Sequence, residues 1–181
     1  MTPHHLDHVL NTLVEFVNTG KPAAPTEELS DVEAVRIFIK ARIITEVEEP
    51  TAADLPPLYV VRSRLRAIVT APNEAAKTRL VNDALASAMI TPRLAEHDGL
   101  GRHFHYFPAY ASLSEHLLAD CAMAIALLIS SGEAVRLRTC SAPGCSNIFV
   151  DSSRNRSRTY CDSKKCGGRL HSAAYRRRQR A

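Results

Sequence analysis

The chain has 181 residues, of which 45% are hydrophobic and 23% are charged, and this fits one or two compact domains. No stretch approaches the roughly 20 uncharged apolar residues that a membrane-spanning helix needs, and the first 18 residues lack the basic start of a secretion signal. The composition excludes collagen-like, coiled-coil and wholly disordered chains, and it predicts a cytoplasmic protein that does not enter a membrane.

Hydrophobic residues recur at helical spacing in four segments before residue 90. Asn18 and Gly20 end the first segment, and Ser30 with Glu33 has the spacing of a capping box at the start of the second. Prolines between residues 50 and 57 predict a break before the third. The predicted helices cover residues 6–18, a segment that follows the capping box, residues 58–69, and residues 72 to about 88.

The pattern changes after residue 90. Two short runs, 90–96 and 102–107, flank a connection that contains Asp and Gly, and this predicts a β-hairpin. Ser112 and Glu115 form another capping box before the most hydrophobic segment, 113–131, which is predicted to be a buried core helix. The sequence therefore predicts a mostly α fold with one hairpin (class α+β) in a body that covers residues 1–133.

Charge is divided unevenly between the two ends of the chain. Residues 136–181 carry twelve Lys and Arg and two Asp, a net charge of +10, whereas residues 1–135 carry a net charge of −6. An acidic body with a basic end favours a polyanion as the partner, and nucleic acid is the first candidate. The alternative is a solvated basic tail that binds nothing.

Four of the five cysteines lie within 27 residues, in two pairs of equal spacing: Cys140 with Cys145, and Cys161 with Cys166. Two such pairs bring four thiolates to one tetrahedral cation, which favours a structural Zn²⁺ ion with no open position for catalysis. Another metal or an iron–sulfur cluster, disulfides and free thiols are the alternatives. The remaining thiol, Cys121, is predicted to be a small buried hydrophobe.

The segment around these cysteines contains few large apolar residues, so a metal is needed to order it as a small module over residues 134–181 that ends in a basic helix. Its Arg, Lys and Asn side chains are predicted to contact phosphates, with Arg169 and Arg154 also offsetting the charge of the thiolates. The predicted nucleic-acid-binding residues are Arg154, Asn155, Arg156, Arg158, Lys164, Lys165, Arg169, Arg176, Arg177, Arg178 and Arg180.

The order of these residues resembles a known module. The run Arg138-x-Cys140-x4-Cys145-x3-Phe149-x-Asp151-x-Ser153-Arg154-Asn155-x-Ser157-Arg158-x2-Cys161-x4-Cys166-Gly167-x-Arg169 is similar to the CGNR zinc finger. That module ends the chains of a bacterial family of stress-induced transcriptional regulators, whose N-terminal part is called the ABATE domain. Residues 13–19 resemble an early segment of that domain. One position departs from the name-giving motif, because Gly168 stands where the family has Asn.

The function of the body is less defined by its sequence. Asn18 and Arg66 are candidate contacts for an anionic small-molecule effector, while a helix cap and a solvated face are the plainer interpretations. The i, i+4 pair His4 and His8 could bind adventitious metal, although helix capping at the surface is the favoured interpretation, and nothing marks the strand pair His103 and His105 as catalytic. The chain shows no nucleophile elbow, phosphate loop or zinc-protease motif, so we do not expect an enzyme.

Together, these observations predict a transcriptional regulator that binds duplex DNA through a zinc module, with the body sensing an effector, contacting a partner or forming a homodimer. An RNA-binding module and a protein-interaction module, each with a structural zinc, are the alternatives. RNA binding is disfavoured by the small number of aromatic side chains available for stacking.

Overall fold

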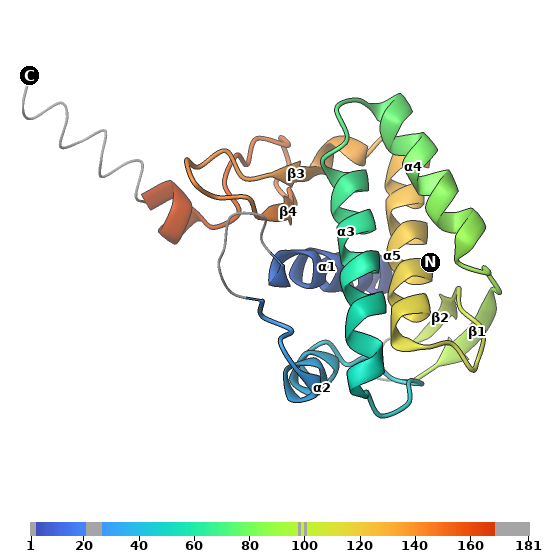
Figure 1. Cartoon of the computed structure of the whole chain (residues 1–181). Coiled ribbons are helices and arrows are strands. Elements are labelled where there is room, and N and C mark those ends of the chain that lie inside the picture. The colour runs from blue at the N-terminus through green and yellow to red at the C-terminus, as the bar shows by residue number, and fades with distance from the viewer. Residues whose placement is uncertain (1–2, 21–26, 98, 100, 169–181) are drawn as a thin grey trace, which may run out of the picture.

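The computed structural model describes residues 3–20, 27–97, 99 and 101–168, and the side chains from residue 5 onward within these ranges. Most of this part of the chain is helical, and two small antiparallel ribbons complete it (Figure 1). The basic helix predicted at the C-terminal end lies outside the described residues. The five α-helices are α1 (Pro3–Thr19), α2 (Val32–Ala41), α3 (Leu55–Val69), α4 (Glu74–Ser87) and α5 (Leu113–Ser130).

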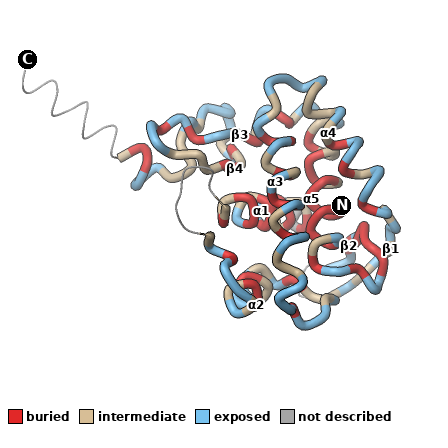
Figure 2. Tube along the Cα trace, in the orientation of Figure 1, coloured by how far each residue is buried: buried red, intermediate tan, exposed pale blue. Residues whose placement is uncertain are grey.

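The body is built around α5. Helices α3 and α4 pack against it and against each other, and α1 crosses both α3 and α5 (Figure 1). Leu13 and Phe16 of α1 meet Leu65 of α3 and Ile125 of α5 in one core, in which each is almost fully removed from water. The outer surfaces of α2 and α4 are among the exposed parts of the chain (Figure 2). The helical periodicity of the sequence therefore correctly predicted which faces of these helices are buried.

Contrary to the sequence prediction, one helix of the described residues, α5, is long and apolar enough to cross a membrane by length and composition alone. In the structure it is the central helix of the body, and α1, α3 and α4 cover its apolar side chains. Its ends agree with the sequence prediction: Ser112 and Glu115 form the capping box, and Gly132 follows the helix with a φ of +71°. The hydrophobicity of α5 thus reflects burial within the protein.

Several helix starts differ from the sequence prediction by up to three residues, and two of them have a clear local cause. Asp31, rather than Ser30, caps α2 by accepting a hydrogen bond from the backbone N–H of Ala34 at 2.9 Å. Helix α3 begins at Leu55, three residues earlier than expected, and includes Pro56 and Pro57 in its first turn. Proline breaks a helix interior but is compatible with the first turn, where its missing N–H would have no partner in the helix.

The predicted hairpin is present at the end of the body that lies away from the cysteine module (Figure 1). Strands β1 (Arg93–Glu96) and β2 (Arg102–His105) pair antiparallel, with Leu94 opposite Phe104. A second antiparallel pair, β3 (Leu137–Thr139) and β4 (Ile148–Val150), was not predicted. Each of its strands has only three residues, too few for an alternating pattern to stand out from the sequence.

Candidate metal centre and nucleic-acid interface

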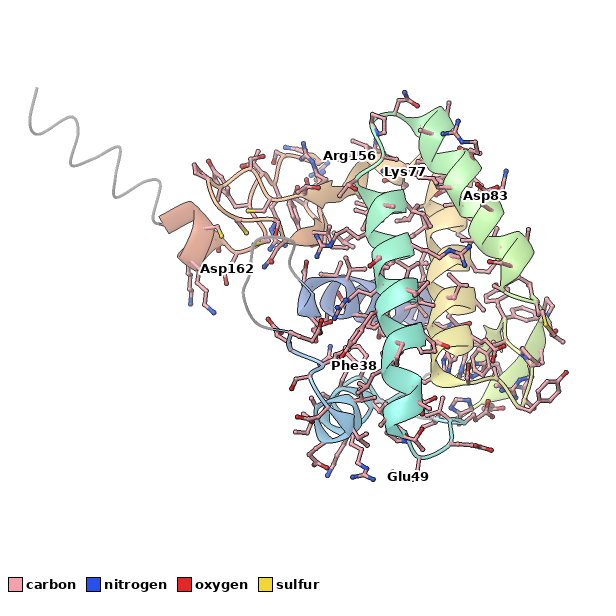
Figure 3. The ribbon with its side chains drawn as sticks, viewed as in Figure 1. Phe38, Glu49, Lys77, Asp83, Arg156 and Asp162 are labelled. Carbon is pink, nitrogen blue, oxygen red and sulfur yellow. The ribbon has the colours of Figure 1, made fainter. Side chains whose placement is uncertain are left out.

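The four cysteines of the predicted site come together around the β3–β4 ribbon. Cys140 directly follows β3, and Cys145 lies beyond a turn in which Gly144 has a φ of +74°, a conformation that favours glycine. Cys161 precedes a single helical turn, Ser163–Gly167, and this turn carries Cys166. Asp162, labelled in Figure 3, begins the turn by accepting hydrogen bonds from the backbone N–H groups of Lys164 and Lys165.

The sulfur positions fit one tetrahedral ion. All four Sγ atoms lie within 4.8 Å of one another, with 3.8 Å between Cys145 and Cys161 and 3.7 Å between Cys161 and Cys166. A tetrahedral Zn²⁺ with Zn–S bonds of about 2.3 Å separates its sulfur ligands by about 3.8 Å, whereas a disulfide needs about 2.0 Å. The distances therefore favour a metal site over the disulfide alternative.

The chemistry of the thiols leads to the same conclusion. Burial, followed by hydrogen bonds from the other three thiols, raises the pKa of Cys161 to about 12. Without a metal the thiol of Cys161 would thus stay protonated at neutral pH, and a bound Zn²⁺ would replace its proton. The backbone N–H of Cys161 donates to Sγ of Cys140 at 3.4 Å, a bond that would stabilise a thiolate there.

Asp151 organises the loop between the two cysteine pairs. Its carboxylate is fully buried and accepts hydrogen bonds from the backbone N–H and hydroxyl of Ser153, from the backbone N–H of Arg158 and from the guanidinium of Arg138. Burial alone would raise the pKa of Asp151, but these hydrogen bonds lower it to about 2. In the sequence, this loop-organising role of Asp151 was indicated only by its position in the run that resembles the CGNR zinc finger.

We expect Asp151→Ala to weaken zinc binding by about 10- to 100-fold, because Asp151 holds the loop that leads to Cys161. Competition with a chromogenic chelator measures this change directly. Asp83→Ala, which removes an exposed carboxylate from α4, is the matched control and should leave zinc affinity unchanged. An equal effect of the two substitutions would contradict the role of Asp151.

The predicted phosphate contacts fall into two groups in the described part of the module. Arg154, Asn155, Lys164 and Lys165 are exposed, as a nucleic-acid interface requires. Arg158 instead points into the module, where its Nε donates to the carbonyl of Tyr160 at 2.9 Å and its guanidinium lies 5.1 Å from the ring centre of Phe149. The remaining predicted contacts, Arg169, Arg176, Arg177, Arg178 and Arg180, lie outside the described residues.

Two further arginines differ from the sequence interpretation. Arg156 is exposed but pairs at 2.5 Å with Glu133, beside the C-terminal end of α5 (Figure 3). Arg154, expected beside the thiolates, is exposed, and Arg158 takes that place through a hydrogen bond to the carbonyl of Cys161. Sequence spacing alone does not show which of these alternating arginines are buried and which are exposed, because the partner of each one depends on the three-dimensional course of the loop.

The two candidate effector residues join the module to the body. The amide of Asn18 donates to the carbonyl of Ile148 and accepts from its N–H, both at 2.9 Å, as a neighbouring strand would. Arg66 donates to the carbonyls of Ser146 at 2.9 Å and of Val17 at 2.6 Å. Effector binding by these residues stays a prediction; the role that the structure assigns to them is docking.

Ile148 itself belongs to the body's core, although it lies in β4. A separate small cluster around Cys140, Ala142, Phe149 and Cys166 remains inside the module. The module thus has even less apolar material of its own than the sequence suggested. The combination of a helical body with a small, metal-dependent module defines the chain as a zinc-finger protein.

Comparison with known families names both parts. Residues 10–132 match the ABATE model, described as "Putative stress-induced transcription regulator", and residues 136–179 match the CGNR zinc finger. The chain therefore belongs to the ABATE family and carries a CGNR zinc finger, in which Cys140, Cys145, Cys161 and Cys166 form the structural zinc site. No curated protein matches the chain significantly.

Steric crowding of the Cβ position does not explain why Gly168 replaces the Asn of the name-giving motif. Gly168 has helical backbone angles, and a Cβ atom added there would have its nearest contact at 3.8 Å from the carbonyl oxygen of Ser163. A Cβ atom would therefore fit at this position. Gly167 is more confined, because an added Cβ would lie 3.4 Å from the ring of Tyr160.

Proposed function

We propose that this chain is a cytoplasmic transcription regulator that binds duplex DNA through its zinc module and carries out no catalytic reaction. The body would hold the module in place and receive a signal or a partner. The proposal depends mainly on how the module is oriented. Asn18 and Arg66 of the body bind the backbone of the module on one side. The basic side chains of Arg154, Lys164 and Lys165 are exposed to solvent.

Charge supports the same proposal. The chain after residue 135 has a net charge of +10, and a structural zinc with four thiolates offsets only about two of these charges. A basic module of this kind binds phosphates and releases counterions. The descriptions of both matched families are consistent with this role.

The geometry disfavours RNA as the primary target. Recognition of single-stranded RNA relies on aromatic side chains that stack on unpaired bases. Within the described module, Phe149 is buried and Tyr160 packs against the cysteine cluster. Neither ring is placed to stack on a base.

Salt-dependent binding to duplex DNA tests the proposal. We expect the logarithm of the association constant to fall linearly with the logarithm of salt concentration, with a slope near −0.9 per phosphate contacted. Replacing both Lys164 and Lys165 by Ala should reduce that slope by about one per lysine that contacts a phosphate and weaken binding to all sequences alike. Fluorescence anisotropy with labelled duplexes gives both quantities.

Arg79→Ala removes an exposed cation from α4 of the body and is the matched control. It should leave the salt slope as in the wild type. Binding without a salt slope, tighter binding to single-stranded RNA, or no binding at low salt would each overturn the proposal, and the last would favour a protein partner. Sedimentation of the DNA complex tests the predicted homodimer.

A further inference from the structure

Three histidine side chains meet at one point beside the β1–β2 hairpin. His97 follows β1, and His103 and His105 lie two residues apart on β2, so their side chains share one face of that strand. Nε2 of His105 lies 2.8 Å from Nε2 of His97 and 3.1 Å from Nε2 of His103. The ligand atoms of all three lie within 4.8 Å of one another.

While the rings are neutral, two-centre hydrogen bonds can satisfy only one of these two short N···N contacts. Nδ1 of His103 lies 2.7 Å from the carbonyl of Gly101, so it carries the proton and leaves a lone pair on Nε2. If Nε2 of His105 donates to that lone pair, it cannot also accept from His97. If it accepts from His97, two lone pairs face each other between His105 and His103.

A metal ion resolves the conflict, because it accepts all three lone pairs. Tetrahedral Zn²⁺ with Zn–N bonds of about 2.1 Å separates its nitrogen ligands by about 3.3 Å, slightly more than the two short distances found here. A neutral imidazole is the form that binds a metal.

The outer nitrogens of His97 and His103 each lie within hydrogen-bond distance of a group that can orient the ring, and that of His105 lies near a carboxylate. Nδ1 of His103 faces the carbonyl of Gly101, and Nδ1 of His97 lies 3.3 Å from the hydroxyl of Thr45. Nδ1 of His105 lies 3.9 Å from the buried carboxylate of Asp120 on α5. Metal-binding histidines characteristically have such partners, which fix the ring and its tautomer.

The size of the surrounding cavity favours an ion over a metabolite. Its volume is about 40 Å³, whereas sites for small organic ligands have volumes of about 300–1,000 Å³. His5 of α1 stands over the cluster, with its ring centre 4.4 Å from that of His103. The described walls therefore leave space for an ion and little more.

We propose that His97, His103 and His105 form a second metal site, in the body, that takes a divalent transition ion of the zinc class. Imidazole ligands suit Zn²⁺, Co²⁺ and Ni²⁺, and three of them leave a fourth position for water or another ligand. This site is separate from the cysteine site and does not depend on DNA binding. The sequence did not reveal it, because the orienting groups come from distant segments.

The test uses the full-length, untagged chain with zinc already bound at its cysteines. We expect a titration with Zn²⁺ alone to show one further equivalent per chain, and elemental analysis after dialysis to find two ions. His97→Asn should lose the second equivalent and keep the first. Because the side chain of His97 is 25% exposed, this variant is expected to fold.

Further variants distinguish metal binding at this site from loss of folding and from metal binding at other histidines or at the cysteines. His103→Gln should also lose the second ion, with its fold checked by circular dichroism. His171→Asn, which removes a histidine remote in sequence from the hairpin, should retain both ions. Co²⁺ bound at the second site should lack the thiolate charge-transfer bands expected at the first. The proposal fails if the wild type takes up only one ion, or if folded His97→Asn still binds two.

Discussion

Removal of zinc is expected to unfold residues 137–168 while the helical body stays folded. The module retains only a small apolar cluster of its own, around Phe149, and its ribbon strands have three residues each. Structural zinc contributes about 10–16 kcal/mol in small peptide sites, far more than such a cluster can supply. The body has its own core around α5, to which Leu137 and Ile148 of the ribbon contribute, and this core does not involve the metal.

Thiol reactivity in the presence of a chelator measures this result. Four thiols should become reactive together, while Cys121, which is fully buried in α5, should react only when denaturant unfolds the body. Burial also raises the pKa of Cys121, which slows its reaction further. Amide hydrogen exchange should show the same division between the module and the body.

Two variants sharpen the test. Cys161→Ser removes one zinc ligand and should reproduce the effect of the chelator, whereas Cys121→Ala removes a thiol from the body and should retain the zinc. If all five thiols react together on chelation, the body depends on the module for its stability. If the amides of residues 137–168 stay protected without metal, the zinc is not what orders the module.

The parts of the fold that the sequence predicted are those with local causes. The cysteine ligands stand in two short pairs, so their spacing alone indicated one metal site. The capping box at Ser112 and Glu115 was likewise readable, because a helix cap involves residues three apart. Helical periodicity then indicated which face of each segment would be buried.

The contacts that escaped prediction join distant segments. Asn18 and Ile148 are separated by 130 residues, and no local pattern in either segment indicates the other. The histidine cluster shows the same limitation: the pairing of His103 and His105 on one strand face is visible in the sequence, but the approach of Asp120 from α5 is not. The inward orientation of the Arg158 side chain likewise depends on the conformation of its loop, which the sequence does not show.

Asn18→Ala is expected to lower the free energy of unfolding of the zinc-loaded chain by about 2–6 kcal/mol. The substitution removes both hydrogen bonds to Ile148 and leaves that residue's N–H and C=O groups buried without their partner. Each such group costs about 1–3 kcal/mol. Arg66 still holds the neighbouring Ser146, so we expect the module to loosen at β4 first.

Asn11→Ala is the matched control, because Asn11 lies exposed on the same helix and gains the same helix propensity when replaced by alanine. Urea unfolding of the two variants isolates the docking contribution, and exchange of the Ile148 amide locates it. Because Asn18 and Arg66 hold adjacent backbone, the double variant with Arg66→Ala should deviate from additivity. A change within about 0.5 kcal/mol of the control, together with a still-protected Ile148 amide, would show that Asn18 does not fasten the finger to the body.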